Sequence, residues 1–217
     1  MYAMKTSTIV NRRLRLRTFT LRRLRLTVFQ IFLSCLSVGL GLTVLPSYSQ
    51  SALTVNEDGA RRSPDIHWPH GFSPREADLF AHNEISIGAP CSTVWRHIVE
   101  APKWPQWYPN SQDVQIVGDR GRTLKPSSRF EFTTFGLHID ARISEFVPES
   151  RVGWFGDGEG INAYHTWLLI SDPPGCHVVT EEVAKGPAAI ALRESDPNTM
   201  HRGHDLWLNT LKVLSEK

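Results

Sequence analysis

The residues best placed to do chemistry are His165 and a pair of adjacent glutamates farther along the chain. Side chains alternate along a strand, so His165 shares a face with Trp167 and Leu169, and these apolar neighbours indicate that the face looks inward. A buried imidazole can bind a ligand oxygen or act as an acid or base near neutral pH. The alternative is a core histidine whose nitrogens are satisfied by neighbouring backbone or hydroxyl groups.

Glu181 and Glu182 follow each other on another expected strand. They therefore point to opposite faces, and at most one of them can reach the interior. We predict Glu182 as the partner of His165 in any acid–base chemistry. The alternative for either glutamate is a place at the surface or at the rim.

His201-x-x-His204 has the spacing of two metal ligands on one helical face. No carboxylate or cysteine is visibly placed to complete a site of three or four ligands, so we predict no metal site and no cofactor. The chain also lacks G-x-S-x-G, G-x-x-x-x-G-K-[ST] and G-x-G-x-x-G. This removes the motif grounds for a serine hydrolase, a P-loop enzyme or a dinucleotide-binding protein.

The formal net charge of +2 hides an uneven distribution along the chain. Residues 1–49 hold eight basic and no acidic residues, which leaves 16 basic against 22 acidic residues and a net charge of −6 for the remainder. Phosphate binding needs a basic face on the folded domain, so we expect no nucleic-acid partner.

Residues 26–45 form an uncharged, mostly apolar run behind a basic stretch, which is typical of an export signal. Small residues at 47–51 fit cleavage near Gln50 or Ala52, and the protein would then be exported, periplasmic or secreted. Twenty helical residues also span about 30 Å of hydrocarbon, so residues 1–49 can instead hold an uncleaved membrane anchor. Residues 50–78 are rich in Ser, Pro, Gly and charge and predict a linker.

A domain is expected over residues 79–217. It begins with a strand near residues 80–87 and a helix that Pro90 starts, followed by an aromatic, proline-rich break at residues 104–109. Six short strands follow, with turns too short for parallel crossovers; they are expected at residues 114–117, 129–135, 137–146, 151–155, 163–170 and 177–183. An amphipathic helix from Met200 to Leu214 must bury one face, and only the sheet is large enough to cover it.

In this order, several segments resemble the START/polyketide cyclase-dehydrase-like superfamily (SRPBCC). The segments are Ile85-Ser86-Ile87-Gly88-Ala89-Pro90-x3-Val94-Trp95, Trp104-Pro105-x-Trp107, residues 141–148, Arg151-Val152-Gly153-Trp154, His165-Thr166-Trp167 and Glu181-Glu182. The resemblance implies an α+β helix-grip fold, in which a curved antiparallel sheet of about seven strands wraps around a long C-terminal helix. The turn at residues 173–177 departs from the glycine-rich turn that the family often has.

The resemblance also implies a cavity between the sheet and the C-terminal helix. We expect it to bind a small lipophilic molecule, such as a lipid, quinone or polyketide, in a non-catalytic carrier or sensor. One alternative is a cyclase or dehydratase-like enzyme that uses His165 and a glutamate, and another is a protein-interaction module with a filled interior. The expected ligand-binding residues are Phe132, Trp154, Trp167, Met200 and Trp207 in the walls, with Trp104 and Trp107 near the mouth. For each of them, packing alone is the alternative, and the sequence predicts no oligomeric state.

Cys91 and Cys176 lie a few residues from the end of the first strand and the start of the last one. In a helix-grip sheet these two strands pair antiparallel. An oxidising compartment would allow a disulfide, provided that the Cα atoms lie within about 7 Å of each other. Two separate thiols are the alternative.

Overall fold

The structure, a computed structural model, describes residues 55–118 and 121–217, so the predicted signal or anchor in residues 1–49 lies outside the described part. The described residues contain one seven-stranded sheet with the order β1-β7-β6-β5-β4-β3-β2, in which every neighbouring pair is antiparallel. The strands are β1 (Leu79–Ile87), β2 (Ser111–Ile116), β3 (Arg129–Thr134), β4 (Leu137–Val147), β5 (Arg151–Gly158), β6 (Ile161–Asp172) and β7 (Gly175–Lys185).

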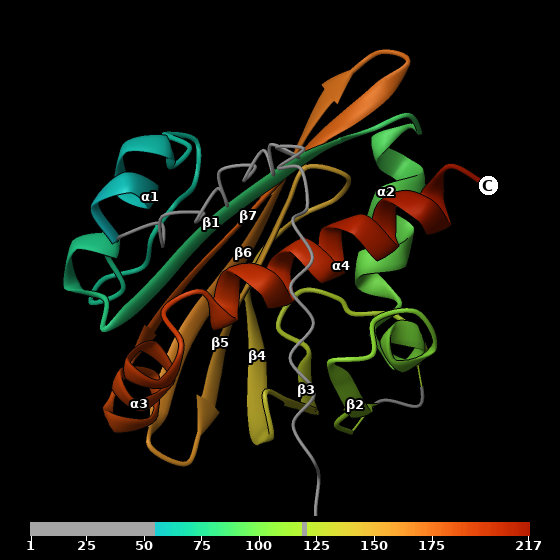
Figure 1. Ribbon diagram of the computed structural model, residues 1–217. Helices are drawn as coiled ribbons and strands as arrows, with labels where there is room; N and C mark the ends of the chain where they lie inside the picture. Colours follow the sequence, from blue (N-terminus) through green and yellow to red (C-terminus); the bar gives the residue numbers. More distant parts are fainter. Residues whose placement is uncertain (1–54, 119–120) are drawn as a thin grey trace, which may run out of the picture. The chain divides into compact units, whose positions relative to one another are not determined.

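A long helix, α4 (Thr199–Ser215), lies across one face of this sheet (Figure 1). Its buried side is supplied by residues at helical spacing, among them Met200, His204, Trp207, Leu208 and Leu211. The predicted helix-grip fold, with a curved sheet wrapped around the C-terminal helix, is thereby confirmed.

The remaining helices lie around the edges of the sheet (Figure 1). They are α1 (Val55–Arg61), α2 (Cys91–Val99) and α3 (Pro187–Ser195), with 3-10 turns η1 (Pro74–Glu76) and η2 (Ala101–Gln106). The proline-rich aromatic break is the turn η2, which accommodates Pro105 because it is a short 3-10 segment. Helix α3 was not predicted; Pro187 is at its first turn, where a proline is tolerated.

Residues 50–78 were expected to be a linker, but in the structure residues 55–61 form α1 and residues 62–78 cover the outer face of the sheet. Ile66 packs against Leu168 and Val179, and Trp68 meets the ring of Tyr164 edge-on at 5.9 Å between centroids. Both faces of β6 are therefore buried from residue 163 to residue 169. The apolar side chains spaced through this polar segment supply the cover, and composition alone does not reveal it.

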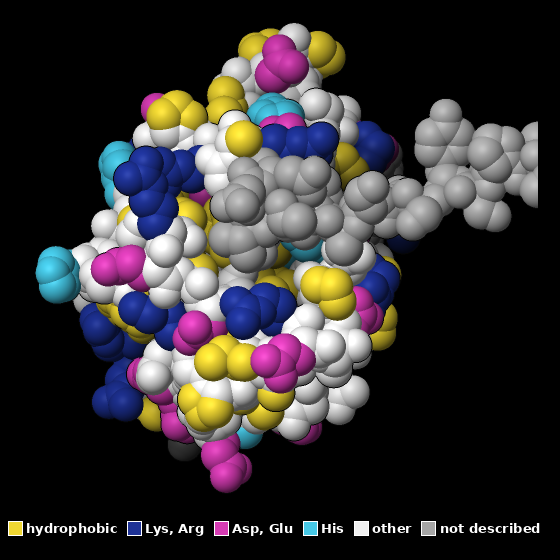
Figure 2. All heavy atoms as spheres, turned by 60° about the vertical axis from the view of Figure 1, so that its left-hand side comes forward, with side chains coloured by type: hydrophobic (Ala, Val, Ile, Leu, Met, Phe, Trp, Pro, Cys, Tyr) yellow, Lys and Arg dark blue, Asp and Glu magenta, His cyan; other side chains and the backbone are white. Residues whose placement is uncertain are grey.

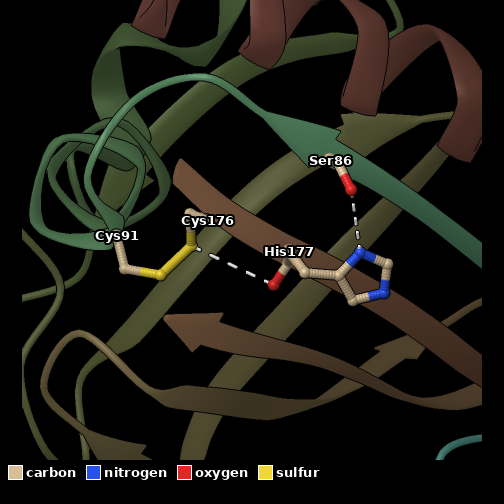
Figure 3. The surroundings of a disulfide bond; sticks show 4 residues. All are labelled: Ser86, Cys91, Cys176 and His177. Carbon is tan, nitrogen blue, oxygen red and sulfur yellow. Dashed lines mark hydrogen bonds between the residues drawn. A yellow bond between two sulfur atoms is a disulfide. The ribbon is translucent and has the colours of Figure 1, made fainter. Parts of the chain in front are cut away.

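A disulfide joins Cys91 to Cys176 with 4.9 Å between the Cα atoms (Figure 3). The register explains the bond, because Ile87 pairs with Cys176 and Ser86 with His177 across β1 and β7. The turn after β1 then brings Cys91, the first residue of α2, back to the same point. Of the two alternatives that the sequence left open, the structure shows the bridge.

Among the described residues, no helix has the length and apolarity needed to cross a membrane. On the face drawn in Figure 2, basic side chains are interspersed with acidic and hydrophobic ones and form no single basic patch.

Candidate functional site

A pocket lies between the inner face of the sheet and α4, and it contains about 40 Å³ of free space. That volume holds a few water molecules. Its walls are mostly carbon, from side chains that include Leu79, Phe132, Ile139, Trp154, Ile161, Met200 and Trp207. Its polar lining comes from Tyr108, Thr134, His165, Glu182, Thr199 and His204.

The pocket opens where its lining side chains become partly exposed. These are Thr134, Phe135 and Leu137 around the β3–β4 turn, together with Leu192 on α3 and Thr199, the first residue of α4. All other residues of the lining except Glu182 are buried, so the opening lies at the N-terminal end of α4.

Phe135 occupies a left-handed backbone conformation, with φ of 49°, in the two-residue turn between β3 and β4. A type I′ turn needs positive φ at both central residues, and Gly136 supplies the second at 76°. The Phe135 ring reaches α4 at Gly203, where an added Cβ would lie 2.4 Å from Cζ of the ring. The missing side chain of Gly203 therefore lets this ring lie against the helix at the pocket opening.

His165 comes from β6 and is 5% exposed. Its ring lies against Trp154 at 4.7 Å and over Trp167 at 5.6 Å, and its Nε2 is 2.7 Å from Thr180 Oγ1. Burial lowers the pKa of His165 to about 3, although the charge of Glu182 acts in the opposite direction. The imidazole is therefore neutral at neutral pH.

Glu182 from β7 brings its carboxylate to both histidines. Its Oε2 lies 3.4 Å from His165 Nδ1 and 3.1 Å from His204 Nε2. Burial raises the pKa of Glu182, but the two neighbouring histidines, His165 and His204, outweigh this effect and leave the pKa below its usual value. An ionised carboxylate in this position needs positive charge next to it.

His204 on α4 is 1% exposed, and its ring lies over that of His165 with 4.9 Å between centroids. Its Nδ1 is 3.2 Å from Asn83 Oδ1 on β1. Three elements, β6, β7 and α4, thus bring two imidazoles and one carboxylate together, with one ligand atom from each within 4.8 Å of the others.

Six of the predicted site residues line this pocket: Phe132, Trp154, His165, Glu182, Met200 and Trp207. Trp167 is fully buried beneath His165 and meets Trp207 edge-on at 5.0 Å, so it lies under the closed part of α4 and does not reach the pocket. Strand alternation correctly predicts that Trp167 shares a face with His165. It does not predict that α4 packs directly against this part of the sheet and covers Trp167.

Trp104 and Trp107 also lie outside the pocket lining, not at its mouth. Trp104 is fully buried, donates a hydrogen bond from Nε1 to the Ile98 carbonyl at 3.0 Å, and packs edge-on against Trp207 at 5.1 Å. Trp107 is partly buried against the same core. The residue of this break that does line the pocket is Tyr108, which stacks on Trp207 at 4.4 Å.

His201 and His204 do not face a common site. His201 Nε2 lies 2.7 Å from Asp58 Oδ2, whereas His204 turns to Glu182. The His201-x-x-His204 spacing therefore does not form a two-ligand pair. The residues that do lie near His204 are His165 and Glu182, which come from other elements and are distant in the sequence.

Glu181 was expected at the surface or rim, but it is fully buried on the outer face of the sheet. Its Oε1 is 2.7 Å from His82 Nδ1 and accepts a hydrogen bond from the Ser63 amide at 2.8 Å. The covering segment is the reason, because it encloses the outer face that would otherwise be in solvent.

Comparison with known proteins gives a family and a fold. A family model described as polyketide cyclase / dehydrase and lipid transport matches residues 81–203. No curated protein sequence is significantly similar to the chain.

Several solved structures share the fold. Hypothetical protein jhp0584 from Helicobacter pylori is 32% identical with a TM-score of 0.66, over 71% of this chain and 98% of that chain. The protein TTHA0849 from Thermus thermophilus is 17% identical with a TM-score of 0.53, over 63% of this chain and 96% of that chain. A START superfamily protein from Mycobacterium smegmatis is 11% identical with a TM-score of 0.50, over 63% of this chain and 97% of that chain.

Proposed function

The chain belongs to the polyketide cyclase / dehydrase and lipid transport family, and from this premise we propose that it binds a small lipophilic molecule between the sheet and α4. The observation that carries the proposal is the pocket itself, whose walls are mostly carbon and whose ionisable lining residues, His165, Glu182 and His204, lie together. An apolar pocket with a few convergent polar groups is the usual form of a small-molecule site. The ligand is therefore an apolar molecule that carries an oxygen function for the polar wall.

The ligand must displace the side chains at the opening. Sites for drug-sized molecules enclose about 300–1,000 Å³, whereas this pocket has about 40 Å³ of free space. Phe135 and Leu192 are partly exposed at the opening and can turn outward without uncovering the rest of the core. The proposal accordingly includes an outward movement of these side chains on binding.

A panel of apolar probes in matched pairs, each with and without a carbonyl or hydroxyl group, tests this function. Tryptophan fluorescence should change on titration, because Trp154 and Trp207 line the pocket. Ala163→Leu, which adds bulk to the lining, should weaken binding at least about tenfold. The matched control is Ala191→Leu on the exposed side of α3, which should bind as the unmodified chain does.

His165→Ala should weaken the oxygen-bearing probes more than their hydrocarbon partners. If no probe changes the fluorescence or the melting temperature, the pocket is a packed interior. The domain would then be a protein-interaction module, and both the carrier and the enzyme would be excluded.

A second candidate is an acid–base enzyme, favoured by the convergence of three ionisable groups in one apolar pocket. A neutral imidazole beside an ionised carboxylate can remove a proton from carbon next to a carbonyl group. Deuterium exchange from heavy water into bound apolar ketones would detect this, and Glu182→Gln should slow it at least about 100-fold. Unaccelerated exchange with every ketone that binds would leave the carrier as the function.

We also propose that the protein acts outside the cytoplasm. The signal-like run of residues 26–45 supports this, and so does the Cys91–Cys176 bridge, because disulfides persist in oxidising compartments. N-terminal sequencing from the native host should find a chain that begins near Gln50 or Ala52. An intact N-terminus in a membrane fraction would identify an anchor instead, and a soluble cytoplasmic chain beginning at Met1 would contradict export.

A further inference from the structure

The hydrogen bonds of Thr180 are compatible with a proton on Nε2 of His165. The Thr180 oxygen lies 3.2 Å from the Thr166 carbonyl, to which the hydroxyl can donate. The same oxygen lies 2.7 Å from His165 Nε2 and can then accept from an Nε2–H. In this tautomer the lone pair on Nδ1 faces Glu182.

His204 is held in the same way by Asn83. The Asn83 amide nitrogen donates to Asp205 Oδ1 at 2.7 Å and to the His201 carbonyl at 3.2 Å. Its oxygen is therefore the acceptor for His204 Nδ1–H at 3.2 Å. This leaves Nε2 of His204 as the atom that faces Glu182, 3.1 Å from its Oε2.

Two imidazole nitrogens thus face one carboxylate oxygen, Glu182 Oε2, at 3.4 Å and 3.1 Å. When both nitrogens are unprotonated, the three electron-rich atoms repel one another at these distances unless a cation lies among them. A proton on His204 alone would satisfy only one of the two nitrogen–oxygen contacts. A metal ion satisfies all three atoms at once.

We propose that His165 Nδ1, Glu182 Oε2 and His204 Nε2 bind a divalent transition-metal ion, with zinc the best fit. Bonds of about 2.0–2.1 Å in a tetrahedral site separate neighbouring ligand atoms by about 3.3 Å, and the two nitrogen–oxygen distances bracket this value. Two histidines and one carboxylate leave a fourth position, which is the pattern of sites that bind water or substrate.

Thr180 and Asn83 act as positioning residues. Metal-bound histidines almost always donate their second N–H to a fixed acceptor, which sets the tautomer and the ring orientation. Both histidines have such an acceptor in the buried interior, because Thr180 and Asn83 are 0% and 7% exposed. All three proposed ligands line the pocket, so an oxygen of a molecule bound there could take the fourth position.

Another group on the described surface, Glu131, His138 and Asp140, also brings three possible ligand atoms together. Its members lie partly or fully in solvent, and His138 Nε2 is 4.0 Å from Asp140 Oδ1. It serves as the control for adventitious surface binding, and His138→Gln removes it without touching the pocket.

The test uses the full chain, stripped with a chelator and titrated with Co²⁺ as a visible probe and with Zn²⁺ by competition. One equivalent of Co²⁺ should bind and give the visible absorption spectrum of a four-coordinate Co²⁺ site. His204→Gln and Glu182→Gln should each weaken binding more than about 100-fold, and Thr180→Val, which keeps all three ligands, should weaken it about 10–100-fold. His138→Gln should bind like the unmodified chain.

If a ligand variant does not fold, Thr180→Val and X-ray absorption of the Zn²⁺-loaded chain, which should show two imidazole ligands, decide the question. Binding that His138→Gln abolishes, or that is equally weak in the unmodified and His204→Gln chains, would overturn the site in favour of a proton-bridged ion pair. The metal alone is the probe, so this result is independent of whether an apolar ligand binds.

Discussion

Reducing the Cys91–Cys176 bridge should remove a large share of the stability of the domain. The bond closes a loop of 85 residues. In the loop-entropy description, such a crosslink restricts the unfolded chain by about 4.6 kcal/mol at 25 °C. Small domains are stable by about 5–15 kcal/mol, so this loss is between about a third and nearly all of the total.

Urea unfolding with and without a reductant measures this loss. With a typical slope of about 2 kcal/mol per molar urea, the midpoint should fall by about 2 M on reduction. A thiol titration of the denatured chain supplies the chemical check. The full-length chain has three cysteines, so it should show one thiol, from Cys35, before reduction and three afterwards.

The double variant Cys91→Ser and Cys176→Ser is the control. It should unfold near the midpoint of the reduced protein, and the reductant should leave it unchanged. Three thiols in the unreduced chain would show that the bridge does not form. An unchanged midpoint in a chain whose bridge has demonstrably been reduced would refute the argument from loop length.

Three further perturbations follow from the packing. Trp167→Ala should cost about 3–5 kcal/mol in urea unfolding, because this ring is fully buried and lines no pocket; a loss below about 1 kcal/mol would show unrecognised space beneath it. Gly203→Ala should cost less than about 1 kcal/mol, because the partly exposed Phe135 ring can turn away from the added methyl group and alanine favours a helix; a loss above about 2 kcal/mol would show that the ring is held against α4. Burial lowers the pKa of His97, so the unfolded chain takes up a proton near pH 6.5 that the folded chain does not. The free energy of unfolding should therefore fall as the pH drops below about 6.5, and His97→Gln should lessen that fall in melting curves at pH 7 and pH 5; an unchanged pH dependence would count against it.

Much of the fold could be predicted because its elements repeat at short intervals. Alternation along the strands and the three-and-four spacing of α4 are local signals, and a meander leaves little choice of topology. Helix α3 was missed because it is short and alanine-rich, with a weak apolar face. The cover by residues 62–78 was missed because Ile66 and Trp68 are isolated apolar residues in a polar segment, and only the finished sheet gives them a surface to bind.

Only the part of the site that depends on the alternation of side chains along the strands could be predicted from the sequence. His165 and Glu182 each follow from their place on a strand face. Their meeting with His204 depends on how α4 lies over β7, which no periodicity specifies. Thr180 and Asn83 carry no sequence signal, since a threonine or an asparagine in a strand gains its role from the ring that it faces.

The pairing of β1 with β7 also determines when this chain can fold during its synthesis. Leu79 pairs with Ala184, so the first strand lacks a partner until more than 100 further residues have been made. The cover of the inner face, α4, is made later still. Contacts so distant in sequence carry a high entropy of loop closure and slow folding. A growing chain that ends before residue 175 therefore has neither the partner of its first strand nor the helix that covers the inner face of the sheet.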